Sequence, residues 1–319
     1  MDEPEGDPPE EKKPLTREDV ERLIEEHGGP EGLDLSGRDL READLTELDL
    51  HGAHLSDANL QGADLRHGNL QQANMVLANL QGADLSGANL QGADPSDANL
   101  QGAYLYAANL QEANLRWANL QGAALLWANL QGAALSGADL RRARLAYANL
   151  RDANLEGANW GDYVLGEEID GLFGAAASAY RALKQWHTEA GMYDVAGEFH
   201  YREMEARRKA AWKARRLPYA SAMYLLRFLY GYGERPLLVV AWAAAVILGF
   251  ALGHWLFGTV AGGLWDALYY SAVSFTALGY GWAAEPQGWA GRFLGVGESL
   301  LGVFMMALFL VTFTRKMTR

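Results

Sequence analysis

A period of five residues runs through the first half of this 319-residue chain. From Glu31 to Trp160, leucine recurs at every fifth position except at Met75, Pro95 and Trp160, and alanine or another small residue usually stands two places earlier. The 3.6-residue period of a helix and the 2-residue period of a strand do not divide five, so neither element explains the pattern. A fixed period of this kind predicts a stacked solenoid instead.

Units such as Gln61-Gly62-Ala63-Asp64-Leu65 resemble the pentapeptide-repeat family, whose pattern is A-(D/N)-L-x-x. The resemblance covers residues 31–160 and implies a right-handed quadrilateral β-helix with four units in each coil. Each leucine is then expected to point to the axis, and coils stack at the strand spacing of about 4.8 Å. Pro95 has no backbone donor and is expected to mark a local distortion.

The solenoid needs a capped end. Residues 1–30 are expected to form an acidic tail followed by a capping helix over 16–27. Thr16 and Asp19 have the spacing of a capping box, and an apolar stripe follows them.

The outer surface of the predicted rod carries a local group of aromatic residues. Ala107, Trp127 and Tyr147 recur at 20-residue spacing, beside Tyr106 and Leu126. An exposed patch at Tyr106, Trp127 and Tyr147 favours docking of a cytoplasmic partner, which the sequence does not identify. A few tolerated surface aromatic residues explain the pattern equally well.

Residues 161–235 break the repeat and are expected to form a helical hairpin linker with a basic run and an interfacial helix. The basic run consists of Arg207, Arg208, Lys209, Lys213, Arg215 and Arg216. Basic residues beside a membrane span favour the cytoplasmic side. The net charge of −13 also argues against a nucleic-acid partner.

Two long apolar runs, 236–257 and 292–314, are each long enough to supply the ~20 residues that a helix needs to cross a bilayer. The segment Gly279-Tyr280-Gly281 lies between them. Irregular backbone at membrane depth is tolerated only where protein shields it or where it lines water. A loop whose carbonyl groups replace an ion's water shell satisfies that condition, so this region predicts a cation pore.

Residues 236–319 resemble the two-transmembrane potassium-channel pore. The matching residues are Ala267-Leu268-Tyr269-Tyr270-Ser271, Phe275 to Gly281, Gly291-Arg292 and Gly302. The resemblance implies an all-α pore domain with a re-entrant pore helix and filter. Its parts are an outer helix over 236–257, a pore helix over 264–275, a filter over 277–281 and an inner helix over 292–314.

The resemblance also assigns roles to the filter. The selectivity filter comprises Thr276, Ala277, Leu278, Gly279, Tyr280 and Gly281. Carbonyl groups of Ala277, Leu278, Gly279 and Tyr280 would hold the permeant monovalent cation, K+ or Na+, and no other cofactor is implied. A ring of such carbonyl groups requires several copies, so a homotetramer is expected. The residues expected to support the filter are Tyr269, Tyr270, Val273, Trp282 and Glu298.

Three positions depart from the family pattern. The family usually has threonine at Ala277 and aspartate at Trp282, and some relatives have a carboxylate at Val273. Without these groups the innermost ion site and the filter support are expected to be weaker. A weakly selective cation channel and a non-conducting membrane scaffold are therefore the alternatives.

Two residues of the inner helix are candidates for function. Glu298 places a charge inside an apolar span, where a charge is costly unless it is paired or faces water. It is expected to hydrogen bond behind the filter or pore helix, the alternative being an ion-attracting ring. Gly302 lies where the family places a gating hinge, although close helix packing also explains a small residue there.

The sequence thus predicts a tetrameric, potassium-permeable cation channel in the cell inner membrane, surrounded by lipid, rather than an enzyme. The pentapeptide repeats are expected to form an assembly or regulatory domain. The β-helix and the C-terminus are expected in the cytoplasm, because basic residues flank both spans. Pentapeptide rods can also mimic DNA and inhibit topoisomerases, by family analogy. The acidic residues here are scattered and are not expected to lie along one face, which disfavours that alternative.

Overall fold

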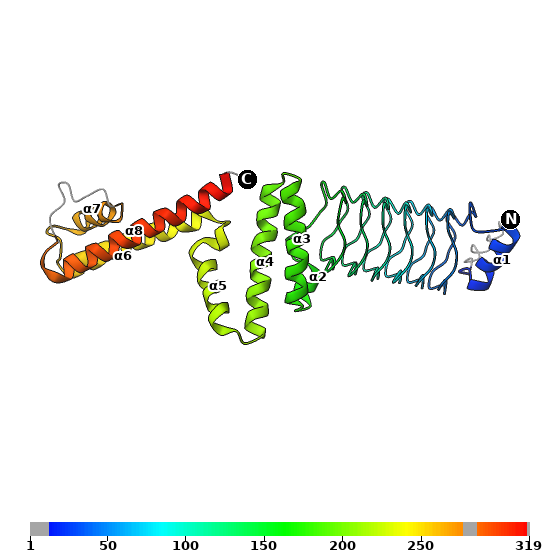
Figure 1. Cartoon of the computed structure of the whole chain (residues 1–319), viewed down its shortest axis with the longest axis horizontal. Helices are drawn as coiled ribbons and strands as arrows, with labels where there is room; N and C mark the ends of the chain where they lie inside the picture. Colours follow the sequence, from blue (N-terminus) through cyan, green and yellow to red (C-terminus); the bar gives the residue numbers. More distant parts are fainter. Residues whose placement is uncertain (1–12, 277–285, 318–319) are drawn as a thin grey trace, which may run out of the picture. The chain divides into compact units, whose positions relative to one another are not determined.

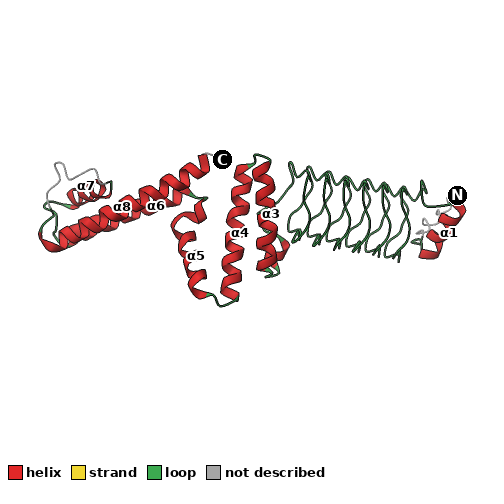
Figure 2. Ribbon diagram, viewed as in Figure 1, coloured by secondary structure: helices red, strands yellow, loops and turns green. Residues whose placement is uncertain are grey.

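The computed structural model describes residues 13–276 and 286–317. The chain divides into two compact units, Met1–Ala190 and Gly191–Arg319. The first unit is a solenoid with helices at both ends, and the second is helical (Figures 1 and 2). The coarse prediction of a β-helix followed by an all-helical region is therefore confirmed.

The solenoid is built from isolated parallel bridges that join residues 20 positions apart. Because one unit has five residues, four units complete a coil. Backbone groups link each coil to the next: the Leu60 N–H donates to the Asn79 carbonyl at 2.8 Å, and the Asn79 N–H donates to the Ala58 carbonyl at 2.9 Å. Figure 2 draws this region as loop, since each bridge joins only one residue pair.

Leucine and alanine fill the interior of the coils. Leu60, Leu80 and Ala63 have no exposed surface. Met75 and Trp160, which interrupt the leucine period, are buried at the same inward position, with 0% and 6% exposure. Full burial of one such side chain contributes roughly 1.5–3 kcal/mol, so the fifth-position residue stabilises every coil.

Asparagine side chains form ladders along two opposite sides of the solenoid. On one side, Nδ2 of Asn79 donates to Oδ1 of Asn59 at 3.1 Å, and Asn99 donates to Asn79 at 3.1 Å. On the other side, Asn129 donates to Asn109 at 3.2 Å. These side-chain bonds run parallel to the backbone bonds and tie each coil to the next.

Pro95 removes one backbone bond between coils. Among the described residues, no bridge joins positions 94 and 114. The neighbouring bonds remain, because the Asn114 N–H donates to the Ala93 carbonyl at 2.9 Å and Asn114 Nδ2 donates to Asp94 at 2.9 Å. The expected distortion is thus limited to one missing bridge.

Helix α1, Arg17–His27, caps the first coil as predicted. Thr16 and Asp19 form the expected capping box, and Val20 is fully buried. Arg17 also reaches the solenoid, where its guanidinium donates to the Thr46 carbonyl at 2.8 Å.

Two helices, α2 (Gly166–Ile169) and α3 (Phe173–Glu189), close the other end of the solenoid. The Ala146 N–H, which has no further coil to bond, donates to the buried Glu167 carboxylate at 2.5 Å. Burial raises the pKa of Glu167, against the effect of backbone hydrogen bonds. Nε1 of Trp186 donates to the Ala153 carbonyl at 2.8 Å. The sequence predicted a linker here and gave no sign of this second cap.

The second unit begins with α4 (Tyr193–Lys213), α5 (Leu217–Tyr230) and the short 3-10 helix η1 (Gly231–Gly233). The buried Glu205 carboxylate accepts hydrogen bonds from Arg208 at 3.0 Å and from the Tyr232 hydroxyl at 2.9 Å. Burial alone would raise the pKa of Glu205, but these donors outweigh it and the pKa is lowered. Because α3 and α4 belong to different units, the predicted hairpin packing stays a prediction.

The rest of the second unit comprises α6 (Pro236–Leu256), α7 (Leu264–Phe275) and α8 (Gly288–Met317). Helices α6 and α8 are long and apolar enough to span a membrane. The three helices pack against one another, and Val239, Phe275 and Met305 form a buried cluster between them. The bounds of α7 agree with the predicted pore helix, and α8 begins four residues before the predicted inner helix.

Candidate functional site

The candidate site is the packing of α7 between the two apolar helices, and Glu298 of α8 lies at its centre. This side chain has no exposed surface and accepts a hydrogen bond from the Ser271 hydroxyl of α7. Ser271 also lies 2.9 Å from the Ile247 carbonyl of α6. Glu298 therefore contacts α7 within the chain, and its predicted role, as a support behind the filter or as an ion-attracting ring, stays a prediction.

His254 of α6 faces the same carboxylate. Its Nε2 lies 3.7 Å from Glu298 Oε2, and both side chains have no exposed surface. Nδ1 of His254 lies 2.7 Å from the Thr259 hydroxyl, which in turn donates to the His254 carbonyl at 3.3 Å. His254 thus faces Glu298 of α8, and the contact with the Thr259 hydroxyl holds its ring in place.

The close approach of α8 to the end of α7 requires glycine at position 302. A Cβ atom added to Gly302 would collide with the backbone carbonyl of Phe275, the last residue of α7. By contrast, a Cβ atom added to Gly297 of the same helix would meet nothing within 4 Å. The geometry gives Gly302 a packing role, while a hinge at this residue stays a prediction.

The predicted filter lies mostly outside the described residues. Thr276 is described, and its hydroxyl contacts the Ala272 and Val273 carbonyls at 3.1 and 3.0 Å. The predicted filter residues Ala277, Leu278, Gly279, Tyr280 and Gly281, together with Trp282, are outside the described residues.

The predicted supporting residues of α7 lie in different surroundings. Tyr270 is fully buried, and its ring packs edge-on against His254 with centroids 4.9 Å apart. Tyr269 is 57% exposed within the single chain, and Val273 is half-buried. Support of a filter by these side chains stays a prediction.

The aromatic patch predicted on the solenoid is present as an exposed group. The rings of Trp127 and Tyr147 stack with centroids 4.5 Å apart, and Tyr106 is 53% exposed. Tyr104 is also 53% exposed. A parallel bridge joins it to Ala124, 20 residues later, so the two residues lie on the same side of the solenoid in consecutive coils. The 20-residue period indicates this position, although Tyr104 is not among the residues predicted for the patch.

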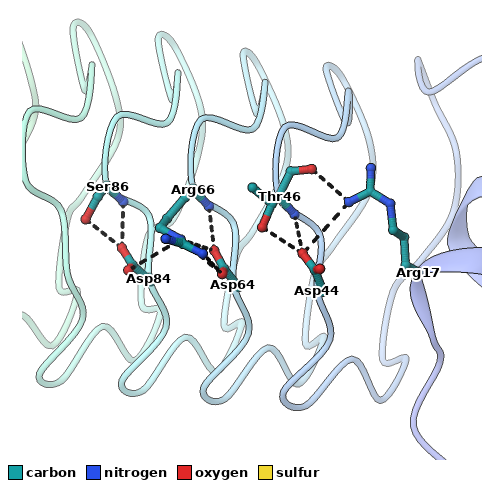
Figure 3. Close-up of polar contacts among 7 residues, drawn as sticks. All are labelled: Arg17, Asp44, Thr46, Asp64, Arg66, Asp84 and Ser86. Atoms are coloured by element: carbon teal, nitrogen blue, oxygen red, sulfur yellow. Dashed lines mark hydrogen bonds and ion pairs between the residues drawn. The ribbon is translucent and has the colours of Figure 1, made fainter.

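Three aspartates that are scattered in the sequence align along the same side of the solenoid. Asp44, Asp64 and Asp84 follow one another at 20-residue spacing, as Figure 3 shows. Arg66 lies 2.6 Å from Asp64 and 3.9 Å from Asp84, and Arg17 lies 3.8 Å from Asp44. The expectation that acidic residues do not lie along one face is therefore wrong for these three aspartates, although Arg66 and Arg17 offset part of their charge.

Hydrogen bonds lower the pKa of two carboxyl groups in this column. For Asp44 the principal donor is the Thr46 side chain, and for Asp64 it is Arg66. Among the described residues, no group of three or more His, Asp or Glu side chains is placed to hold a metal ion.

Several residues of the α6–α7–α8 cluster were not singled out in the sequence. Ser271 appeared only within the family resemblance, and His254 and Thr259 were not considered. The available signal was an ionisable histidine near the end of an apolar span, which is rare unless it is paired.

Comparisons with known proteins cover both parts of the chain. The pentapeptide-repeat family matches in eight copies within residues 31–94 and 98–159. The ion channel family matches residues 237–319. No curated protein matches the chain.

Several solved structures are similar to the repeat region. HetL, a pentapeptide repeat protein of the cyanobacterium Nostoc sp. strain PCC 7120 involved in heterocyst differentiation regulation, is 39% identical over 40% of this chain and 65% of its own, with a TM-score of 0.17. Another pentapeptide repeat protein of the same cyanobacterium is 30% identical over 47% of this chain and 100% of its own, with a TM-score of 0.18. One from the thylakoid lumen of Arabidopsis thaliana is 34% identical over 34% of this chain and 68% of its own, with a TM-score of 0.15.

The chain thus spans about two thirds of the length of HetL. The family assignment rests on the repeat matches and on the sequence identity to these proteins. The chain belongs to the pentapeptide-repeat family, and its C-terminal residues 237–319 match the ion channel family.

Proposed function

We propose that this protein is a homotetrameric cation channel that conducts potassium passively through residues 276–281. The observation that carries the proposal is the fixed position of the end of α7 between two apolar helices. Ser271 is tied to Glu298 and to α6, and Phe275 lies against Gly302. The segment that follows α7 therefore starts from a rigid support, which a ring of ion-binding carbonyl groups requires.

The direction of α7 also favours a cation. The carbonyl end of a helix carries a partial negative charge, and α7 ends at Phe275, directly before the proposed filter. Glycines at positions 279 and 281 allow the backbone angles that turn successive carbonyl groups toward one axis. In a tetramer, four such segments would surround the permeant K+ or Na+ ion.

A weakly selective cation channel is the second candidate, and the sequence at Ala277 and Trp282 favours it. Ala277 supplies no hydroxyl to the innermost ion site, and Trp282 supplies no carboxylate behind the filter. Both changes are expected to reduce the preference for potassium over sodium.

The basic residues beside α6 and α8 support a cytoplasmic position for the solenoid and the C-terminus, in the inner membrane of the cell. The patch of Tyr106, Trp127 and Tyr147 would then face a cytoplasmic partner. Binding energy at protein interfaces is concentrated in aromatic residues of this kind.

Ion flux into liposomes tests the proposal. Purified full-length protein should admit potassium, and comparison with sodium distinguishes the two candidates. Empty liposomes and liposomes with the Gly279→Pro variant are the controls. If intact tetramers conduct neither ion, the channel proposal is refuted.

The double variant Ala277→Thr, Trp282→Asp separates a weak channel from a scaffold. It should raise potassium selectivity if the native filter conducts weakly. If only the double variant conducts, the native protein is a non-conducting scaffold.

A further inference from the structure

A cavity of about 300 Å³ lies in the second unit and is lined by residues of α4, α5 and α6. Its lining combines basic, aromatic and aliphatic side chains, including Tyr201, Tyr224, Arg227, Arg235, Leu238 and Trp242. The site is separate from the contacts of α7 described above.

The side chains around the cavity carry an excess of positive charge. Nε of Arg227 lies 3.4 Å from Glu205 and 3.2 Å from the Tyr201 hydroxyl, and Arg208 shares the same carboxylate. Arg235 lies over the Tyr201 ring at 4.6 Å, and no carboxylate of the described residues lies within 4.0 Å of it. One carboxylate thus faces two guanidinium groups, and Arg235 forms no ion pair with the residues that the structure describes.

The backbone makes room for Arg235. Gly231 has a φ of +58°, and a Cβ atom there would lie 3.0 Å from Cβ and Cγ of Arg235. A larger residue at position 231 would therefore be strained and would displace the arginine.

The cavity also continues onto the start of an apolar helix. Arg235 directly precedes α6, and Leu238 and Trp242 lie in its first turns. Nε1 of Trp242 donates to the Phe228 carbonyl at 2.8 Å, which fixes the indole. Tryptophan and arginine at the end of a span are typical of the boundary between headgroups and acyl chains.

We propose that this cavity binds the phosphate group of an anionic phospholipid. Arg235 and Arg227 donate to the phosphate oxygens, since the planar guanidinium matches phosphate geometry. The acyl chains lie against Leu238 and Trp242. This inference rests on the membrane position of α6 in the proposed function, but it does not require the protein to conduct ions.

Lipid retention by the full-length protein tests the proposal. Delipidated protein in detergent is incubated with equal amounts of phosphatidylglycerol and phosphatidylcholine that have the same acyl chains, and bound lipid is counted by native mass spectrometry. The wild-type protein should prefer phosphatidylglycerol. Arg235→Gln should reduce its retention about tenfold, as expected for the loss of a charge-assisted contact.

Arg216→Gln is the matched control, because Arg216 is exposed at the start of α5 and is not part of the cavity lining. This variant should retain phosphatidylglycerol like the wild type, and Arg235→Lys should retain an intermediate amount. Equal retention of the two lipids by the wild type would overturn the proposal. So would an unchanged Arg235→Gln variant or an equal loss in Arg216→Gln.

A further arm separates a lipid phosphate from free phosphate. Excess inorganic phosphate should leave phosphatidylglycerol bound, and complete displacement would assign the cavity to soluble phosphate instead. Because no arm measures ion flux, a non-conducting protein that still shows Arg235-dependent retention keeps this inference and refutes only the channel.

Discussion

Replacing Gly302 by alanine tests whether this residue serves packing or bending. The added methyl group would collide with the Phe275 carbonyl. Because that atom belongs to the backbone, it cannot move aside as a flexible side chain does, so the cost should reach the upper part of the usual overpacking range, about 3 kcal/mol. The better helix propensity of alanine offsets about 1 kcal/mol. Gly302→Ala should therefore be destabilised by about 2 kcal/mol.

Gly297→Ala is the matched control on the same helix. Its methyl group meets nothing within 4 Å in the chain, so only the gain in helix propensity remains. That gain is about 1 kcal/mol, which separates the two variants by about 3 kcal/mol. Thermal unfolding of the detergent-purified protein, followed by the loss of soluble oligomer, measures the difference. Equal midpoints for the two variants, with changed ion flux only in Gly302→Ala, would refute the packing argument and favour a hinge.

Three further predictions follow from the other contacts. Glu298→Ala removes the acceptor of the buried Ser271 hydroxyl and should cost about 1–3 kcal/mol, whereas Glu298→Gln keeps an acceptor for Ser271 and should cost less; identical thermal midpoints for all three proteins would contradict this. Asn79→Ala breaks two ladder bonds, whereas the control Asn74→Ala loses a bond within its own turn but no ladder bond. Asn79→Ala should therefore lower the free energy of unfolding by about 2 kcal/mol more than Asn74→Ala. Chemical denaturation of the full chain compares the two variants. The lowered pKa of Glu205 contributes stability above the unfolded pKa, and this stability is lost as the pH falls from about 4.5 through the lower folded pKa. Glu205→Gln should remove that acid dependence, and an unchanged stability profile between neutral pH and acid would rule out the linkage.

The sequence predicted the solenoid well because its information is local and repeated. Leucine at every fifth position determines which side chains point into the interior of each coil. Met75 and Trp160 are buried at the same position. The capping box at Thr16 is also local, so α1 was predicted within one residue. The bounds of α7 were predicted from the family resemblance and agree with the structure.

Contacts between distant residues could not be predicted in the same way. Glu167 closes the last coil by accepting a bond from a residue 21 positions earlier, and nothing in its own neighbourhood of the sequence indicates that. The pairing of Glu298 with Ser271 and His254 depends on how three helices pack. In the sequence, 19 other residues separate Asp44 from Asp64, and as many separate Asp64 from Asp84. Their alignment becomes apparent only once the coil is known to contain 20 residues.

The 20-residue spacing of the bridges has a consequence for how this solenoid tolerates insertions and deletions. Adding or removing 20 residues would lengthen or shorten the rod by one layer and leave every column downstream on its original side. A change of five residues keeps the leucine period, and therefore the interior, but rotates everything downstream by a quarter turn. Such a change would carry Trp127 and Tyr147 away from the side that bears Asp44 and Asp64. Selection for an intact surface would thus favour insertions and deletions of four five-residue units. Folding of the interior alone would permit insertions and deletions of one unit.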